Sequence, residues 1–198
     1  MKKMNLPNKL TLLRIAFVPL IMAAMLIEFP LHWLVAGLLF GAAAITDAFD
    51  GKIARRDHLI TDFGKFADPL ADKVLVISAL ICFVKLGLCG AVALSVIILR
   101  EFAVTSVRLV ASANGKVIAA NMWGKVKTVS QIIAIVAIFT LQLVLDILAL
   151  IPVGEGPLAA VGGVFNVIGQ VLIWITAIIT VISGVKYLVD NKSVISDM

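Results

Sequence analysis

The sequence predicts an all-α integral membrane protein with six transmembrane helices and a short N-terminal helix at the membrane interface. Hydrophobic residues make up 62% of the 198 residues, and charged residues make up only 15%. Soluble domains carry about 25% charged residues. The apolar residues also gather in runs whose lengths approach the roughly 20 residues that a helix needs to cross the hydrocarbon core. Together, these observations argue against an ordinary soluble domain.

Six apolar runs are the expected spans, and their even number places both termini on the same side of the membrane. The runs cover residues 10–27, 31–48, 69–86, 91–111, 126–150 and 164–189. They leave no segment long enough for a separate soluble domain of ordinary size. We therefore expect residues 1–198 to form one membrane domain.

Two further segments are predicted from their prolines, glycines and caps. Asn5 or Asn8 can cap a helix whose first turn contains Pro7. We expect this helix to lie along the interface before the first span. Residues 151–163 contain two prolines and several glycines, which is typical of a loop between the last two spans.

The basic residues predict the orientation of the chain. Of the 17 Lys and Arg residues, only Lys85 falls on the side opposite the predicted termini. Cytoplasmic segments of membrane proteins carry an excess of Lys and Arg, so the termini are expected in the cytoplasm. The net charge of +5 then reflects this topology and an anionic ligand, and we expect no nucleic-acid partner.

Two pairs of aspartates flank the polar segment between the second and third predicted spans. Asp47 and Asp50 are three residues apart, and Asp68 and Asp72 are four apart, so each pair shares one face of a helix. Four clustered carboxylates need a counter-charge, and oxygen ligands suit Mg²⁺ or Mn²⁺. Two such ions would attract a diphosphate and support metal-assisted phosphoryl transfer. A solvated loop with incidental charges is the alternative interpretation.

Three neighbouring residues fit a phosphate ligand near these aspartates. Gly51 directly follows Asp50, where a missing side chain allows close approach of a ligand. Arg55 can offer a planar pair of donors to phosphate, and Thr61 can offer a hydroxyl. This segment therefore predicts a site for a diphosphate at the membrane surface.

The motif resembles the signature of the CDP-alcohol phosphatidyltransferase family. Its spacing is D-x2-D-G-x2-A-R-x8-G-x3-D-x3-D, formed by Asp47, Asp50, Gly51, Ala54, Arg55, Gly64, Asp68 and Asp72. The resemblance implies that the four aspartates hold two Mg²⁺ or Mn²⁺ ions, with Asp68 and Asp72 catalytic and Asp72 the general base. It further implies that CDP-diacylglycerol is contacted by Gly51, Arg55 and Thr61. In the implied reaction, an alcohol oxygen attacks the β-phosphorus of this lipid and CMP is released. The resemblance also implies that the protein is a homodimer.

The basic residues of the second half favour an acceptor alcohol that itself carries phosphate. Those expected to bind it are Arg100, Arg108, Lys116, Lys125 and Lys127. The segments NLPNKLTLLR, ILREFAVTSVR and WGKVKT also resemble the branch of the family that uses sn-glycerol 3-phosphate and makes phosphatidylglycerophosphate. Two alternatives stay open for these residues: Arg100 can pair with Glu101, and the lysines can contact lipid headgroups.

Three rival functions use the same residues. The first is the same chemistry with inositol phosphate as the acceptor. The second is a divalent-cation channel or transporter, but the paired aspartates cluster at one face and no internal repeat is apparent. The third is a scaffold that binds membrane lipids without catalysis. Feeding different acceptors, measuring cation flux and substituting Asp72 would separate these functions.

Overall fold

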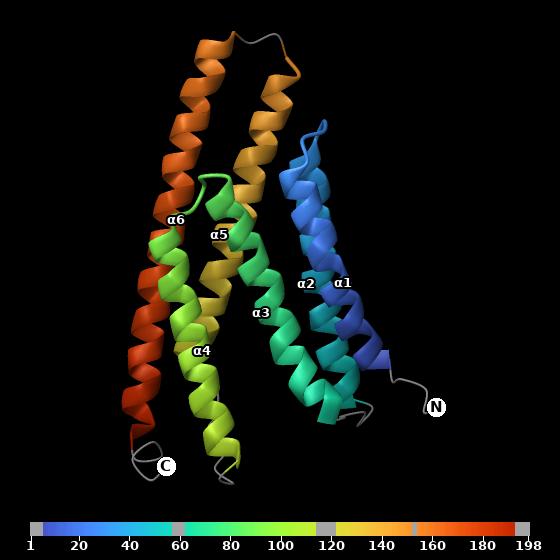
Figure 1. Cartoon of the computed structure of the whole chain (residues 1–198), viewed down its shortest axis with the longest axis vertical. Coiled ribbons are helices and arrows are strands. Elements are labelled where there is room, and N and C mark those ends of the chain that lie inside the picture. The colour runs from blue at the N-terminus through green and yellow to red at the C-terminus, as the bar shows by residue number, and fades with distance from the viewer. Residues whose placement is uncertain (1–5, 57–61, 114–121, 152–153, 193–198) are drawn as a thin grey trace. The chain divides into compact units, whose positions relative to one another are not determined.

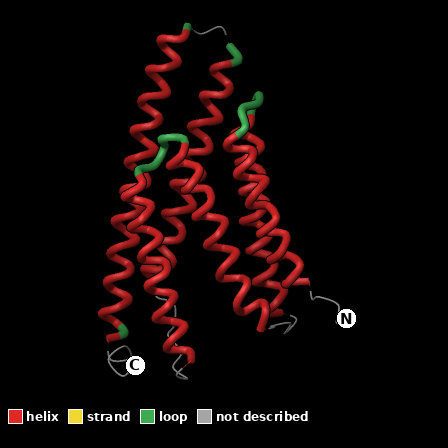
Figure 2. Tube along the Cα trace, in the orientation of Figure 1, coloured by secondary structure: helices red, strands yellow, loops and turns green. Residues whose placement is uncertain are grey.

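The computed structural model is helical over almost all of the residues that it describes. The described backbone comprises residues 6–56, 62–113, 122–151 and 154–192, and the described side chains are those of residues 8–46, 70–112, 122–151, 154 and 156–192. The helices are α1 Leu6–Leu26, α2 His32–Arg56, α3 Asp62–Lys85, α4 Ala91–Ala113, α5 Met122–Ala149 and α6 Glu155–Asp190 (Figure 1). Within these ranges Figure 2 shows helices and connecting loops but no strand. The all-α prediction is therefore confirmed for this part of the chain.

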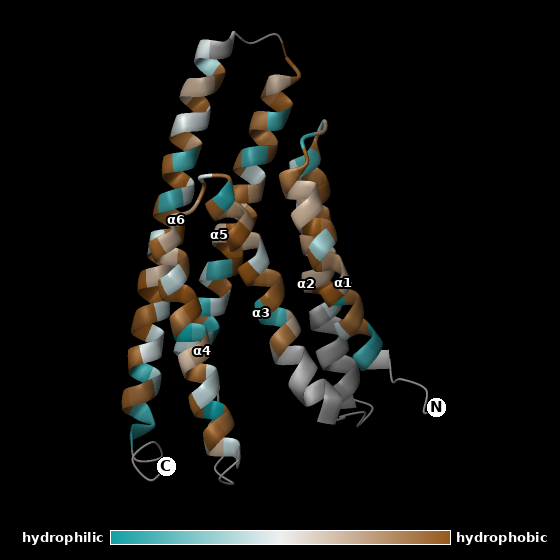
Figure 3. Ribbon diagram, viewed as in Figure 1, coloured by the Kyte–Doolittle hydropathy of each residue, from teal (hydrophilic) through white to brown (hydrophobic). Residues whose placement is uncertain are grey.

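Among the residues whose side chains are described, three helices are long and apolar enough to cross a membrane, as judged by length and composition. They are the Asn8–Leu26 part of α1, the whole of α5, and the Gly156–Asp190 part of α6. The described side chains of α2 add an apolar segment at His32–Thr46. Figure 3 shows hydrophobic residues in brown along these helices. This composition is consistent with a membrane protein, and the six spans remain a prediction.

Helix α1 differs from the expected pair of an interfacial helix and a separate span. It runs without a break from Leu6 to Leu26, so the prediction of a separate N-terminal helix is wrong for the described residues. Pro7 lies in the first turn, where its missing N–H would have had no partner in any case. The helix can therefore start there and continue into the apolar run.

Helix α6 also begins earlier than the sequence predicted. The expected loop at 151–163 ends at Gly154, because α6 starts at Glu155. Pro157 falls in the first turn of the helix, where proline is tolerated. Gly162 lies within α6, and a Cβ atom there would make only an ordinary contact, 3.9 Å from Leu145 Cδ1. The prediction of a loop over the whole segment is therefore wrong.

The chain divides into two compact units, which we describe separately. The first unit comprises Met1–Phe83 and Phe139–Gly162, and the second comprises Val84–Ile138 and Gly163–Met198. One membrane domain over residues 1–198 stays a prediction.

Aromatic side chains form part of the core of the first unit. The ring centroids of Trp33 and Phe139 are 5.8 Å apart, and those of Phe83 and Phe139 are 5.6 Å apart. The backbone N–H of Trp33 also donates to Asp146 Oδ2 at 3.3 Å. Aromatic pairs at these separations add to the apolar burial. These contacts join α2, α3 and the end of α5.

The second unit packs α4 against α6. Val104 and Ala111 of α4 form a buried cluster with Tyr187 of α6, and the partly buried Val107 packs against it. The α3–α4 turn is held as well, because Gln170 Nε2 donates to the Gly87 carbonyl oxygen at 3.3 Å. The polar residues described below lie along this α4–α6 contact.

Candidate active site

The aspartate motif lies on two helices of the first unit. Asp47 and Asp50 belong to α2, which continues through them to Arg56, and Asp68 and Asp72 belong to α3. The helical backbone confirms that each pair can share one helix face. Among the side chains of the motif, only that of Asp72 is described. The side chains of Asp47, Asp50, Gly51, Arg55 and Asp68, and the whole of Thr61, lie outside the described part of the chain.

Asp72 is fixed by a buried arginine from α1. Nη1 of Arg14 donates to Oδ1 of Asp72. The side chain of Arg14 is 0% exposed, whereas that of Asp72 is 51% exposed. A buried guanidinium needs a charged partner to offset its desolvation. The carboxylate of Asp72 is therefore held in one orientation while half of its surface stays open to substrate, water or a cation.

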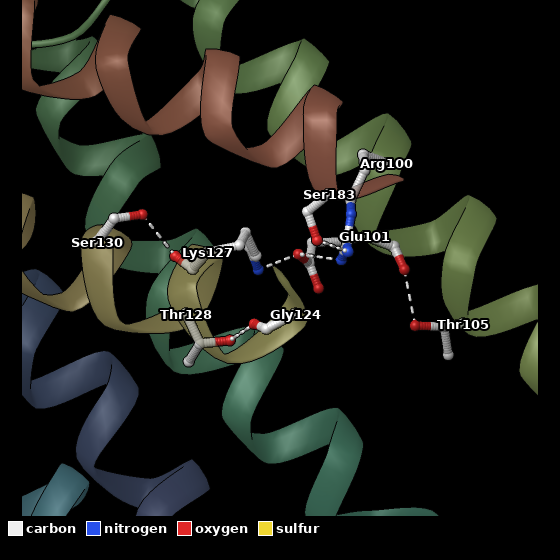
Figure 4. A network of polar contacts seen from close by, with 8 residues as sticks. All are labelled: Arg100, Glu101, Thr105, Gly124, Lys127, Thr128, Ser130 and Ser183. Carbon is white, nitrogen blue, oxygen red and sulfur yellow. Dashed lines mark hydrogen bonds and ion pairs between the residues drawn. The ribbon is translucent and has the colours of Figure 1, made fainter. Parts of the chain in front are cut away.

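A polar network in the second unit contains two of the five predicted acceptor residues. Figure 4 shows Arg100 and Glu101 from α4, Lys127 from α5 and Ser183 from α6 directed toward one another. Arg100 Nη2 donates to Ser183 Oγ at 2.8 Å, and Arg100 Nη1 lies 3.4 Å from Glu101 Oε1. Lys127 Nζ contacts the same Glu101 oxygen. Charge-assisted bonds are usually shorter than about 3 Å, so Glu101 is a weak partner for Arg100.

The network is largely removed from solvent and is positively charged. The side chains of Arg100, Glu101 and Lys127 are 12%, 13% and 7% exposed. Two cations and one carboxylate leave one formal positive charge among them. Charges interact more strongly in a partly buried position than in water. The network could therefore attract an anion.

The other predicted acceptor residues are placed differently. Arg108 lies on α4, eight residues after Arg100 and about two helical turns further on. Its side chain is exposed, as is that of Lys125 on α5. Lys116 lies outside the described residues. The structure thus joins Arg100 and Lys127 through Glu101, while Arg108 and Lys125 face outward.

Sequence reasoning missed Arg14, Ser183 and Gly184. Arg14 is a lone charge within an apolar run, which was a usable signal because charges within membrane helices are commonly functional. Ser183 and Gly184 form a small pair within apolar α6. A Cβ atom at Gly184 would lie only 2.8 Å from Arg100 Cγ, so the close contact between Arg100 and α6 depends on glycine.

Both cysteines of the chain, Cys82 and Cys89, are buried. Burial raises the pKa of Cys89, in the α3–α4 turn, to about 11. Because the thiolate is the reactive form, Cys89 stays an unreactive thiol at neutral pH.

Among the described side chains, no three His, Cys, Asp or Glu residues gather as a metal site. Three of the four motif aspartates lie outside that set.

Comparison with known proteins agrees with the motif. The family model of the CDP-alcohol phosphatidyltransferases matches residues 4–182. The chain belongs to this family. A Bacillus subtilis relative named CDP-diacylglycerol–glycerol-3-phosphate 3-phosphatidyltransferase is 42% identical, over 94% of this chain and 95% of its own. A Rickettsia bellii relative of the same name is 36% identical, over 92% of this chain and 93% of the relative. A probable phosphatidylglycerophosphate synthase of Mycobacterium tuberculosis is 39% identical, over 92% of this chain and 79% of the relative.

CDP-alcohol phosphatidyltransferases generally depend on a divalent metal. The residues of this chain fit such an ion in two respects. The candidate donors are four carboxylates on two helices, and hard cations such as Mg²⁺ prefer oxygen ligands. In addition, the one carboxylate whose side chain is described, that of Asp72, is fixed in orientation and half exposed.

Proposed function

We propose that the protein transfers the phosphatidyl group from CDP-diacylglycerol to sn-glycerol 3-phosphate, giving phosphatidylglycerophosphate and CMP. The observation that carries this proposal is the Asp72 carboxylate. It is half exposed, it is held by buried Arg14, and it lies in the aspartate motif of a family to which the chain belongs. The names of the relatives support glycerol 3-phosphate as the acceptor.

In this proposal Asp72 accepts the proton of the acceptor hydroxyl. The hydroxyl oxygen forms a bond to the β-phosphorus of CDP-diacylglycerol, and the bond from that phosphorus to the oxygen of CMP breaks. Asp47, Asp50, Asp68 and Asp72 would hold two Mg²⁺ or Mn²⁺ ions, whose charge stabilises the departing CMP. A carboxylate near a cation is a weak base, so proton transfer accompanies the attack. Arg14 keeps the carboxylate aligned throughout.

The remaining residues bind the two substrates. Gly51, Arg55 and Thr61 would contact the CDP part of the lipid. Arg100, Arg108, Lys116, Lys125 and Lys127 would receive the acceptor phosphate, which the net positive charge of the Arg100–Glu101–Lys127 network supports. We further propose six spans in a bacterial cell membrane, with cytoplasmic termini and active site, and a homodimer surrounded by membrane lipids.

The decisive test offers single acceptors to the purified protein. CDP-diacylglycerol and Mg²⁺ are supplied with glycerol 3-phosphate, inositol phosphate, serine or glycerol in separate reactions, and CMP release is measured. We expect release only with glycerol 3-phosphate. Release only with inositol phosphate would keep the chemistry and change the substrate. A folded protein that releases no CMP with any acceptor would overturn the proposal.

Substitution of Arg14 tests its part in aligning Asp72. We expect Arg14→Gln to lower kcat by about 10²-fold, because small displacements of a reacting group cost about that much. Both KM values should change little, and Arg14→Lys should recover part of the rate because it restores the charge but not the planar donors. Lys9→Gln removes an exposed cation from the same helix and should leave kcat unchanged. A folded Arg14→Gln variant with normal kcat would contradict this role.

Substitution of Arg108 tests the acceptor pocket. Hydrogen bonds to charged groups contribute about 1.5–3 kcal/mol, so Arg108→Ala should raise the KM for glycerol 3-phosphate at least about tenfold. The KM for CDP-diacylglycerol should stay within about twofold of the wild-type value. Lys85→Ala is the control, since Lys85 is exposed on the side of the membrane opposite the predicted active site. An unchanged KM for glycerol 3-phosphate would move the pocket away from Arg108.

A further inference from the structure

A lysine and a tryptophan contact each other on the surface of the second unit. Nζ of Lys186 on α6 lies over the ring of Trp123 on α5, 5.5 Å from the ring centroid. Trp123 is 39% exposed, and the side chain of Lys186 is exposed as well. A cation at this distance is attracted to the negative face of an aromatic ring. The contact therefore holds an ammonium group at the surface where two helices meet.

The pair lies at the ends of two helices that are long and apolar enough to cross a membrane. Trp123 is the second residue of α5, and Lys186 stands four residues before the end of α6. The 28 residues of α5 give a length of about 42 Å, which exceeds the roughly 30 Å of the hydrocarbon core. The ends of such a helix lie among lipid headgroups, where tryptophan is enriched and lysine extends toward water.

The positive charge of Lys186 is not balanced by a carboxylate. The ion pairs formed among the described residues involve other cations, and Asp190, one turn further along α6, does not pair with Lys186. This differs from Lys127, which contacts Glu101. An aromatic ring has no net charge, so the ammonium group keeps its full charge and N–H donors for a ligand. An anion is the matching ligand.

The surroundings favour the phosphate of a lipid over a soluble anion. Val126 follows Trp123 by three residues and Ile182 precedes Lys186 by four, so each lies about one turn nearer the middle of its helix. Both side chains are 46% exposed. A phospholipid whose phosphate contacts Lys186 can therefore lay its acyl chains along exposed apolar side chains. A soluble anion gains nothing from this apolar surface.

We infer that Lys186 and Trp123 bind the phosphate of an anionic phospholipid of the surrounding membrane. Lys186 supplies the charge, and Trp123 holds it in place and offers its indole N–H as a second donor. A zwitterionic lipid fits less well, because it carries its own cation beside the phosphate. This lipid is a ligand that does not react, so the site is separate from the proposed transfer.

The test measures quenching of Trp123 fluorescence by brominated lipids. Replacing Trp33 and Trp174 by phenylalanine leaves Trp123 as the sole tryptophan of the three. The protein is placed in phosphatidylcholine vesicles that contain the same fraction of either brominated phosphatidylglycerol or brominated phosphatidylcholine. We expect the anionic lipid to bind about fivefold more tightly, as one lysine near the surface provides, and to quench more strongly. In Lys186→Gln the two lipids should quench equally.

Three controls separate a specific contact from general attraction. Trp174 is 44% exposed, and no cation of the described residues lies over its ring, so a protein with Trp174 alone should be quenched equally by both lipids. Lys192→Gln removes another exposed cation just beyond α6 and should leave the preference of Trp123 unchanged. Lys186→Arg should keep it, because a guanidinium group also binds over an aromatic ring.

A measurement on the otherwise unchanged sequence avoids the tryptophan replacements. Native mass spectrometry of the protein taken from mixed micelles counts the phosphatidylglycerol molecules that stay bound. The number should fall in Lys186→Gln and stay at the wild-type value in Lys192→Gln. An equal number in all three proteins would overturn the inference.

The other outcomes are equally decisive. Equal quenching of Trp123 by both lipids, or a preference that survives Lys186→Gln, would overturn the inference. A preference lost equally in Lys192→Gln would reduce it to general attraction by basic residues. A rise in the KM for CDP-diacylglycerol in Lys186→Gln would assign the contact to the substrate, which also overturns it. If the wild-type protein releases no CMP, the proposed function fails, and the quenching comparison still decides whether this site binds lipid.

Discussion

Replacing Asp72 by asparagine is expected to lower turnover by a factor of about 10⁴, at the upper end of what a positioned general base contributes. Asparagine cannot accept the proton of the attacking hydroxyl, and it is a poorer ligand for a hard cation than a carboxylate. It keeps the size of the side chain and one oxygen to receive the hydrogen bond of Arg14. The fold should therefore survive. The measurement is the initial rate of CMP release at saturating substrates, together with the melting temperature.

Asp146→Asn provides the matched control for this experiment. Asp146 belongs to the same unit as Asp72 and accepts a hydrogen bond from the backbone N–H of Trp33, which asparagine can also accept. The same chemical change there should leave turnover within about twofold of wild type, as expected for a substitution away from the reacting groups. Normal turnover by Asp72→Asn would show that Asp72 is not the base.

Much of the fold could be predicted from apolar runs alone. Each expected span falls within or close to one helix of the structure, because about 20 apolar residues both favour a membrane and form a helix. The errors occurred where polar or breaking residues adjoin these runs. Pro7 and Pro157 were taken as marks of a separate segment, yet both lie in first turns, where a proline does not interrupt a helix.

Only the parts of the site that depend on the spacing of residues within one helix could be predicted from the sequence. Asp47 and Asp50 share a helix face at any tertiary arrangement, so their pairing could be inferred from the chain. The contact of Arg14 with Asp72 joins residues 58 positions apart, and that of Arg100 with Ser183 joins residues 83 apart. Neither contact follows from the spacing of residues along one helix, so neither could be predicted from the sequence. A lone arginine in an apolar run indicates that a partner exists, but not which residue it is.

The basic residues show a related limit. Sequence reasoning treated Arg100 and Lys127 as two separate cations for one acceptor phosphate. In the structure Lys127 contacts Glu101, so part of its charge is already balanced within the protein. The charge left for a ligand is smaller than the count of basic residues suggests.

Removal of divalent cations is expected to stop turnover completely. Excess chelator should abolish CMP release, and Mg²⁺ or Mn²⁺ should restore it. Ca²⁺ should not, because it prefers more ligands at longer distances than Mg²⁺. If two ions act together, the rate should rise more steeply than linearly with free Mg²⁺ at low concentrations. Full turnover in excess chelator would contradict a metal site at the aspartates.

A measurement without turnover distinguishes a metal held by the aspartates from one carried in by the lipid diphosphate. An ion that binds only the folded protein stabilises it by about 2.7 kcal/mol at a hundredfold excess over its Kd. Mg²⁺ should therefore raise the melting temperature of the wild-type protein in the absence of substrate. It should raise that of Asp68→Asn much less, because one of the proposed ligands is lost. Equal stabilisation of both proteins would place the ion elsewhere, whereas no stabilisation of either would mean that the diphosphate must supply part of the coordination before the metal binds.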